Sequence, residues 1–491
     1  MKHKLSTTLA TGLLFLFLSP STPVSAKVHS IHGKIKTTAA KRKNVESGAT
    51  AESTTLVAKQ ALTLFTSGAK LLALENLFAI ENPTSIASEV KAEWRSKLSA
   101  TDPILRQAQV KWTNAWTQVF TPAVANAYAA WQTKSLKKEN DFKNAQSLAS
   151  KLDPESDERA WVDWQIALGR GINNQTQSAI EHLQALLDSK QELISEDEIL
   201  MAVARMMFQD GKFKGALHFY DSVSKGSDLW LEAIEEKAWA FMRQNDYEKA
   251  LSQFHTLMTP VFAPQVGPEP YFMGSLADLK ICDYNSIFKI LKDFKNKYNP
   301  ALPELEKLAK TGESPYLTKA IAKLEKGSVS WAALGSDVNK IPRLFNRDVT
   351  LLKSIDRRKE YEKELAVVKA GADPGANSAV NTNVSFDQRV VALAEKHIAE
   401  AKNEIVGRTK QLAANDLKDL TKILQKLRII EVEAMQRIGT DQKTAKKTEV
   451  DPAEKRGEVL SFPKEDEVWL DEVTHYEVTA KGCPTKGGHI K

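Results

Sequence analysis

The residues that could carry out chemistry in this chain do not form a recognisable constellation. His182, His218 and His255 recur along the middle of the sequence, as a row of metal ligands would. They fall at three different positions of the repeated unit described below, whereas zinc needs ligands that converge on one point. We therefore interpret them as surface or packing residues and expect no metal site.

Local catalytic signatures are also missing. The sequence contains no H-E-x-x-H, G-x-x-x-x-G-K-[ST], G-x-S-x-G or C-x-x-C motif, which mark zinc hydrolases, phosphate loops, serine hydrolases and thiol redox sites. A sugar-cleaving enzyme would need two facing carboxylates at a defined separation in a cleft, and we expect no such cleft. The prediction is a protein with no catalytic residue, no cofactor and no enzymatic activity.

The two cysteines, Cys282 and Cys483, are too few for a disulfide-stapled scaffold or a structural zinc cluster. In an oxidising compartment they could pair and tie the C-terminal tail to the last repeat. The alternative is a buried thiol at Cys282 and a free thiol in the tail. Sequence spacing does not decide between them, because a disulfide requires proximity in space.

The N-terminus has the layout of an export signal. Lys2 and Lys4 precede the apolar run LLFLFL, and V-S-A ends at Ala26. This pattern predicts cleavage after Ala26 and a periplasmic location, without lipidation because no cysteine lies near the site. A retained amphipathic anchor is the alternative. No later stretch has 18 uninterrupted apolar residues, so we expect no transmembrane span.

The chain has 491 residues and a formal net charge of +6, which is concentrated at one end. Residues 1–26 carry +2 and the basic arm at 27–50 carries +5, so the remaining 441 residues sum to −1. The body is therefore nearly neutral, and the basic balance is no argument for nucleic-acid binding. We expect no nucleic-acid partner. The length predicts several domains or an elongated repeat array.

The elements that must position any site are helical and repeated. A small or apolar residue recurs at spacings of 34, 37, 34 and 37, at Ala145, Ala179, Ala216, Ala250 and Ile287. Five residues before each stand Asn140, Asn174, Gly211, Asn245 and Cys282. Two helices packed as a hairpin need small residues where they approach closely and a turn residue that tolerates positive φ. The pattern predicts stacked helical hairpins; the alternative is a non-repetitive helical bundle.

The units DEILMAVARMMFQDGKFKGALHFYDSVSKGSD and LEAIEEKAWAFMRQNDYEKALSQFHTLM resemble the tetratricopeptide repeat (TPR) family. The resemblance covers five units in residues 126–298. Unit five departs from the family pattern, with Ile287 at a small-residue position and Asp278 at a usually aromatic one. The resemblance implies an all-α superhelical solenoid in which the first helix of each unit lines a concave, peptide-binding groove.

Nine residues fall on the positions that the resemblance assigns to this groove. They are Trp161, Trp164, Met201, Arg205, Phe208, Glu235, Trp239, Met242 and Arg243. Tryptophan, methionine and arginine often contribute strongly to interfaces, so the set predicts a groove for a partner segment with apolar anchors and an acidic group. For any single residue of the set, packing between helices is an equal alternative.

The remaining segments flank this array. The full division is 1–26 signal peptide, 27–50 basic arm, 51–125 N-terminal helices, 126–298 repeats, 299–370 further helices, 371–384 linker, 385–439 a helical hairpin or coiled coil, and 440–491 a charged linker and tail. Asn415 and Asp416 predict the turn of that hairpin, which either projects as an arm or packs on the array. The segment from Glu472 to Thr479 predicts a short strand.

These features favour a non-enzymatic scaffold that assembles a cell-envelope complex. Partners are expected to be envelope proteins, bound through the groove and the C-terminal helices or tail. The tail pattern of Trp469, Asp471, Glu472 and Tyr476 is similar to envelope proteins of gliding bacteria, and this resemblance implies a motility- or secretion-type complex. The alternative is a protein that binds or processes cell-wall polymer.

Overall fold

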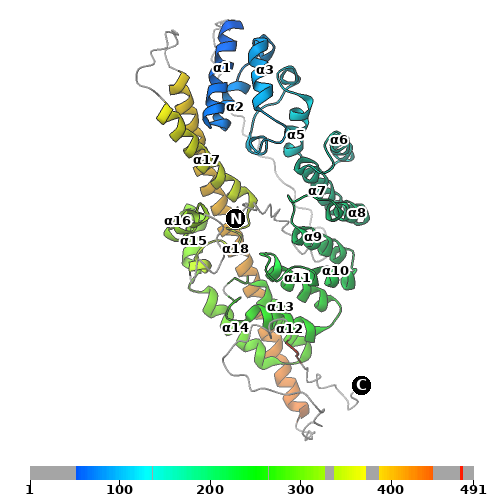
Figure 1. Cartoon of the computed structure of the whole chain (residues 1–491). Coiled ribbons are helices and arrows are strands. Elements are labelled where there is room, and N and C mark those ends of the chain that lie inside the picture. Colours follow the sequence, from blue (N-terminus) through cyan, green and yellow to red (C-terminus); the bar gives the residue numbers. More distant parts are fainter. Residues whose placement is uncertain are drawn as a thin grey trace, which may run out of the picture.

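The computed structural model describes residues 51–134, 136–263, 265–326, 337–371, 386–445 and 476–478. The expected signal peptide, its cleavage site at Ala26, the basic arm and the linker from residue 372 lie outside the described residues. Across the described ranges the chain is helical and contains no strand, which confirms the all-α prediction (Figure 1). None of the described helices combines the length and apolarity needed to cross a bilayer.

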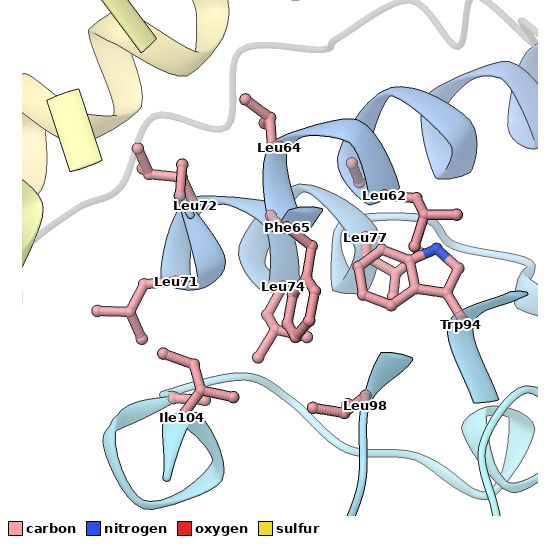
Figure 2. Close-up of a cluster of buried hydrophobic side chains, with 14 of the residues drawn as sticks. Leu62, Leu64, Phe65, Leu71, Leu72, Leu74, Leu77, Trp94, Leu98 and Ile104 are labelled. Carbon is pink, nitrogen blue, oxygen red and sulfur yellow. The ribbon is translucent and has the colours of Figure 1, made fainter. Parts of the chain in front are cut away.

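The N-terminal helices form a compact bundle with its own core. They are α1 (Ala51–Ser67), α2 (Lys70–Phe78), α3 (Ser88–Lys97) and α4 (Ile104–Gln107), with 3₁₀ turns at Pro83–Ser85 and Asn114–Gln118. Leucines of α1 and α2 surround Phe65 and Trp94, whose rings meet edge to face at 5.3 Å (Figure 2). Trp94 is fully buried, and its indole N–H donates to the Ala58 carbonyl at 3.1 Å. This satisfied indole anchors α3 on α1.

Five consecutive helix pairs follow, at the places the repeat pattern predicts. The pairs are α5 (Pro122–Gln132) with α6 (Glu139–Ala149), α7 (Asp157–Ile172) with α8 (Thr176–Asp188), α9 (Glu196–Gln209) with α10 (Phe213–Asp221), α11 (Trp230–Arg243) with α12 (Tyr247–Met258), and α13 (Glu269–Ile281) with α14 (Tyr284–Tyr298). The repeated small positions Ala179, Ala216 and Ala250 are fully buried. Each core cluster joins neighbouring pairs, so the pairs stack as a continuous array.

The turns inside the pairs have the predicted backbone conformation. Asn174, Gly211, Asn245 and Cys282 have φ of 60°, 74°, 60° and 65°. These residues let the chain reverse within two or three residues between helices. Asn140, the corresponding residue of the first pair, instead lies inside α6. Cys282 is disulfide-bonded, and the chain's other cysteine, Cys483, lies outside the described residues.

After the array come α15 (Leu302–Thr311), α16 (Pro315–Leu324), α17 (Val349–Gly371) and α18 (Phe386–Ala445). Helix α18 has 60 residues and is therefore roughly 90 Å long at 1.5 Å per residue. It contributes side chains to three separate cores: Ile398 to the N-terminal bundle, Leu412 to the α15–α17 core and Leu427 to the last repeats. In Figure 1 it runs along the molecule from the N-terminal bundle to the last helix pairs of the array.

The predicted turn at Asn415 and Asp416 is wrong. Helix α18 passes through both residues without a break, and the hairpin is formed instead by α17 and α18, which pack along each other. Asp416 does not cap a helix, because its carboxylate accepts the backbone N–H of Arg343 at 2.7 Å. The C-terminal helices therefore pack on the array, and of the two arrangements considered, the projecting arm is excluded.

Three residues of the tail are described. Tyr476, Glu477 and Val478 have no strand pairing, so the predicted strand is not formed at these positions; its remaining residues are outside the described ranges. Val478 packs against the core of the last repeats, and the Tyr476 ring lies 6.2 Å from that of His255. This part of the tail thus lies against the end of the array.

Candidate functional site

The structure divides the nine predicted groove residues by their surroundings. Trp161, Trp164 and Met201 are buried, with 6%, 3% and 1% of their surface exposed. The Trp161 indole donates to the Thr133 carbonyl at 3.1 Å, and its ring lies 6.1 Å from that of Trp131. These three side chains pack between helices, which is the alternative assigned to them from sequence, and they are not accessible to a partner in this conformation.

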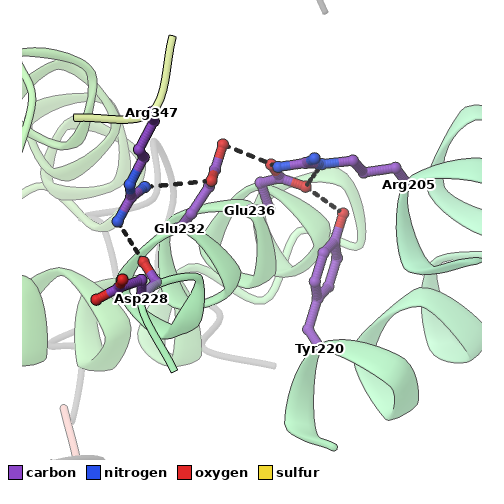
Figure 3. A network of polar contacts seen from close by, with 6 residues as sticks. All are labelled: Arg205, Tyr220, Asp228, Glu232, Glu236 and Arg347. Carbon is purple, nitrogen blue, oxygen red and sulfur yellow. Dashed lines mark hydrogen bonds and ion pairs between the residues drawn. The ribbon is translucent and has the colours of Figure 1, made fainter. Parts of the chain in front are cut away.

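Arg205 of α9 lies at the centre of a polar network between successive repeats (Figure 3). It donates to both carboxylate oxygens of Glu236 on α11, from Nε at 2.9 and 3.0 Å and from Nη2 at 2.6 Å. Its Nη2 also lies 2.9 Å from Glu232 Oε1, and the Tyr220 hydroxyl donates to Glu236 at 2.9 Å. The network joins three consecutive helices, α9, α10 and α11.

The electrostatics of this network favour the charged form of the arginine. Burial alone would lower the pKa of Arg205, but Glu236 and Glu232 outweigh burial and raise it. Burial also opposes ionisation of Glu232, yet Arg205 and Arg347 hold the pKa of its carboxyl below the usual value. Burial, followed by the neighbouring Glu236, raises the pKa of Tyr220, so this hydroxyl stays protonated as a donor. Arg205 therefore has a structural role in joining repeats.

Glu235 lies on the same face of α11 but is not part of the Arg205 hydrogen bonds. Burial raises its pKa to about 8, against the opposing effect of the Arg343 guanidinium. Lys297 of α14 is close enough to interact electrostatically with it, and burial lowers the pKa of this lysine to about 8. Arg343 comes from the segment between α16 and α17. The face of α11 predicted to line a groove therefore meets residues of the C-terminal half.

The remaining predicted residues lie further along the array. Trp239 is half-buried, with its ring 6.0 Å from that of Phe272, which Lys426 of α18 covers at 4.4 Å. Phe208 and Met242 are half-buried beside the cores of the last three repeats, whereas Arg243 is exposed. At the last two repeats, helix α18 thus occupies the side of the array where a partner segment was expected.

Sequence reasoning missed the residues that make these contacts from outside the array. Arg347 lies 3.4 Å from Glu232 Oε2 and also donates to the Asp228 carbonyl (Figure 3). Its separation from Glu232 is 115 residues, so no local pattern signals this pairing. The sequence contains a weak indication that Glu236 belongs to a shared site, because this residue follows Glu232 by four positions and so lies on the same helix face.

Two cavities in the described part of the chain lack the geometry of a glycosidase cleft. A cavity of about 50 Å³ is lined by Arg343 with Asp416 and Asp419, and both carboxylates come from one turn of α18. A second, more open cavity beside α15 and α16 has one acidic lining residue, Glu313. In neither do carboxylates face each other from opposite walls.

The fold defines a class of protein, an all-helical repeat array braced by a long C-terminal helix. Neither a protein-family model nor a curated protein sequence matches this chain.

Proposed function

We propose that the protein is a non-enzymatic scaffold, exported to the cell envelope, whose array is of the TPR type and binds segments of partner proteins. The observation that carries the proposal is the stack of five helix pairs, four of which have a left-handed turn residue at the matching position. Such arrays present extended surfaces whose residues come from successive units. Phe208, Met242 and Arg243 supply half-buried or exposed side chains for this purpose.

The long helix α18 offers a second surface for assembly. Ile429, Val432 and Met435 recur every three residues and are 70%, 50% and 51% exposed. Exposed apolar residues that cluster on one helix face are typical of protein-contact sites. This stripe supports the expectation that C-terminal helices also contact envelope partners, in a complex of the motility or secretion type.

Affinity purification of the tagged protein from crosslinked cells tests the scaffold role. We expect specific envelope proteins to be recovered with the intact chain. Recovery should fall for Arg243→Glu on the array and for the pair Ile429→Ser and Val432→Ser on α18. Glu362→Gln, an exposed change on α17, is the matched control. Recovery of no stable partner would overturn the proposal, and sedimentation with purified peptidoglycan would then favour the cell-wall alternative.

A further inference from the structure

The segment between α16 and α17 has two chemically different sides. We call residues 339–348 the strap. Ile341 and Phe345 are 3% and 0% exposed and pack into the core shared by α15, α16, α17 and α18. Arg343 and Arg347 occupy the alternating positions and lie toward the array. The strap is thus an amphipathic connection between the C-terminal helices and the repeats.

The polar side of the strap meets acidic residues of α11. Arg347 pairs with Glu232 at 3.4 Å and donates to the Asp228 carbonyl. Arg343 has Glu235 as its strongest electrostatic partner, and its guanidinium lies against the loop before α13, where a Cβ on Gly267 would be 2.6 Å from Nη1. Arg347 is therefore ion-paired with Glu232, and Arg343, four residues earlier, interacts electrostatically with Glu235, three residues further along α11.

The strap is bound more completely to α18 than to the array. Asp348 accepts two hydrogen bonds from Arg408 of α18, at 2.9 and 2.6 Å, and the Leu351 N–H at 2.8 Å. Such bidentate pairs are among the strongest polar contacts. On the array side, Arg347 has one ion pair and one hydrogen bond to a backbone carbonyl, and within the described residues its buried Nε and Asn346 Oδ1 have no hydrogen-bond partner. The contact with the array is thus the weaker one.

We propose that the acidic face of α11, formed by Glu232 and Glu235, is an arginine-recognition surface of the array. In this conformation the strap occupies it in cis, and a partner segment with two arginines four residues apart binds it by displacing the strap. The inference rests on the proposed function, because it names the partner chemistry of the same array.

Charge complementarity at a partly desolvated site explains why arginine is the fitting group. Guanidinium is planar, always charged and matched to carboxylates, and oppositely charged partners are selected over like-charged ones. A tethered strap acts as a competitor at high effective concentration. A partner can bind only those molecules in which the strap has left the α11 face. The apparent affinity for the partner is therefore reduced in proportion to the fraction of such molecules.

A peptide with the strap sequence NKIPRLFNRD is a suitable probe for fluorescence anisotropy. With the mature chain, residues 27–491, we expect weak binding. The double variant Arg343→Ala and Arg347→Ala frees α11 and should bind the probe at least ten-fold more tightly. Gly267→Ala, which moves the Arg343 guanidinium without removing a charge, should have a smaller effect in the same direction. Arg357→Ala, which disrupts the Arg357–Glu404 pair elsewhere, is the matched control and should bind as the wild type does.

The specificity of the site is tested with the acidic residues. Adding Glu232→Gln and Glu235→Gln to the double variant should abolish its gain in affinity for the peptide. A peptide in which alanine replaces both arginines should bind to none of the variants. Circular dichroism verifies that each variant is folded. A folded double variant that binds no more tightly than the wild type would overturn the proposal, as would a gain that persists without the two glutamates. The outcome is independent of partner recovery from cells, so the two proposals can fail separately.

Discussion

The carboxylate of Glu364 on α17 accepts the backbone N–H of Leu71, 293 residues earlier in the chain, at 2.7 Å. Its second oxygen accepts the Leu72 N–H at 2.9 Å. These are free donors of the first turn of α2, so Glu364 caps that helix from a distant element. The nearby Glu75 of α2 also lies 2.6 Å from His397 of α18. The C-terminal helices are thereby joined to the N-terminal bundle through polar contacts as well as apolar ones.

Removal of this cap should destabilise the protein. Glu364→Ala leaves two N–H groups of a buried helix end without their acceptor, and we expect a loss of about 2 kcal/mol in the free energy of unfolding. Denaturant titration followed by circular dichroism measures it. Glu362→Ala, an exposed change on the same helix, should remain within about 0.5 kcal/mol of the wild type. Equal effects of the two changes would contradict the capping role.

The buried carboxyl of Asp278 should make stability depend on pH. Burial, with a smaller effect of Asp283, raises its pKa to about 8 in the folded protein. The folded state keeps this proton after the unfolded chain has lost it, so the stabilisation is complete below the unfolded pKa near 4 and is lost as pH rises to 8. The stability gained by Asp278→Asn should therefore be larger at pH 9 than at pH 5, by on the order of 4 kcal/mol. Thermal unfolding at the two pH values checks this, and a pH-independent difference would refute it.

Two glycines with the same φ separate backbone strain from close packing. Gly211 and Gly312 both have φ of 74°, but a Cβ on Gly211 would meet nothing within 4 Å, whereas on Gly312 it would lie 2.5 Å from the Val406 carbonyl of α18. Gly211→Ala should cost about 1 kcal/mol from the left-handed conformation alone. Gly312→Ala should cost roughly 3 kcal/mol, because α15 must also move away from α18. Similar values by denaturant titration would show that α15 and α18 are not in close contact.

The continuity of α18 can be measured as a distance. Ala399 and Val432 are exposed and are separated by 33 residues, which corresponds to about 50 Å along one helix. A hairpin with its turn at Asn415 and Asp416 would place them about 10 Å apart. Genetically encoded spin labels at the two positions, read by pulsed electron resonance, should give the long distance. A dominant short distance would restore the hairpin.

Replacing Arg205, the buried arginine between repeats, should lower the stability of the protein. Arg205→Ala leaves the Glu236 carboxylate without its bidentate partner, and breaking such a buried pair costs about 3 kcal/mol. Arg243→Ala, at an exposed position two helices further along the chain, should change stability by less than about 0.5 kcal/mol. Thermal unfolding of both variants measures the difference. Removing the Tyr220 hydroxyl with Tyr220→Phe should have an intermediate effect, because one neutral donor is lost.

Local residue patterns were enough to predict the helical array. The turn positions of Asn174, Gly211 and Asn245 and the closely packed positions of Ala216 and Ala250 follow from steric requirements within a single hairpin. Such requirements act over fewer than 40 residues and recur in each copy, so a sequence displays them directly.

Contacts between distant segments decided the course of α18 and the position of the strap. Asn415 and Asp416 are residue types that often cap helices. In the structure, however, the Asp416 carboxylate accepts the Arg343 N–H. Helix α18 continues through both residues because Leu412 and Leu420, on either side of them, pack into two different cores. Arg347 and Glu232 are 115 residues apart. Their pairing depends on the path of the whole chain, so no local or repeated sequence pattern predicts it. The sequence by itself therefore determined that this protein contains a stack of helical hairpins. Only the tertiary structure decided that the chain's own strap and long helix lie against that stack, because ion pairs and apolar contacts form between whichever surfaces the fold brings together.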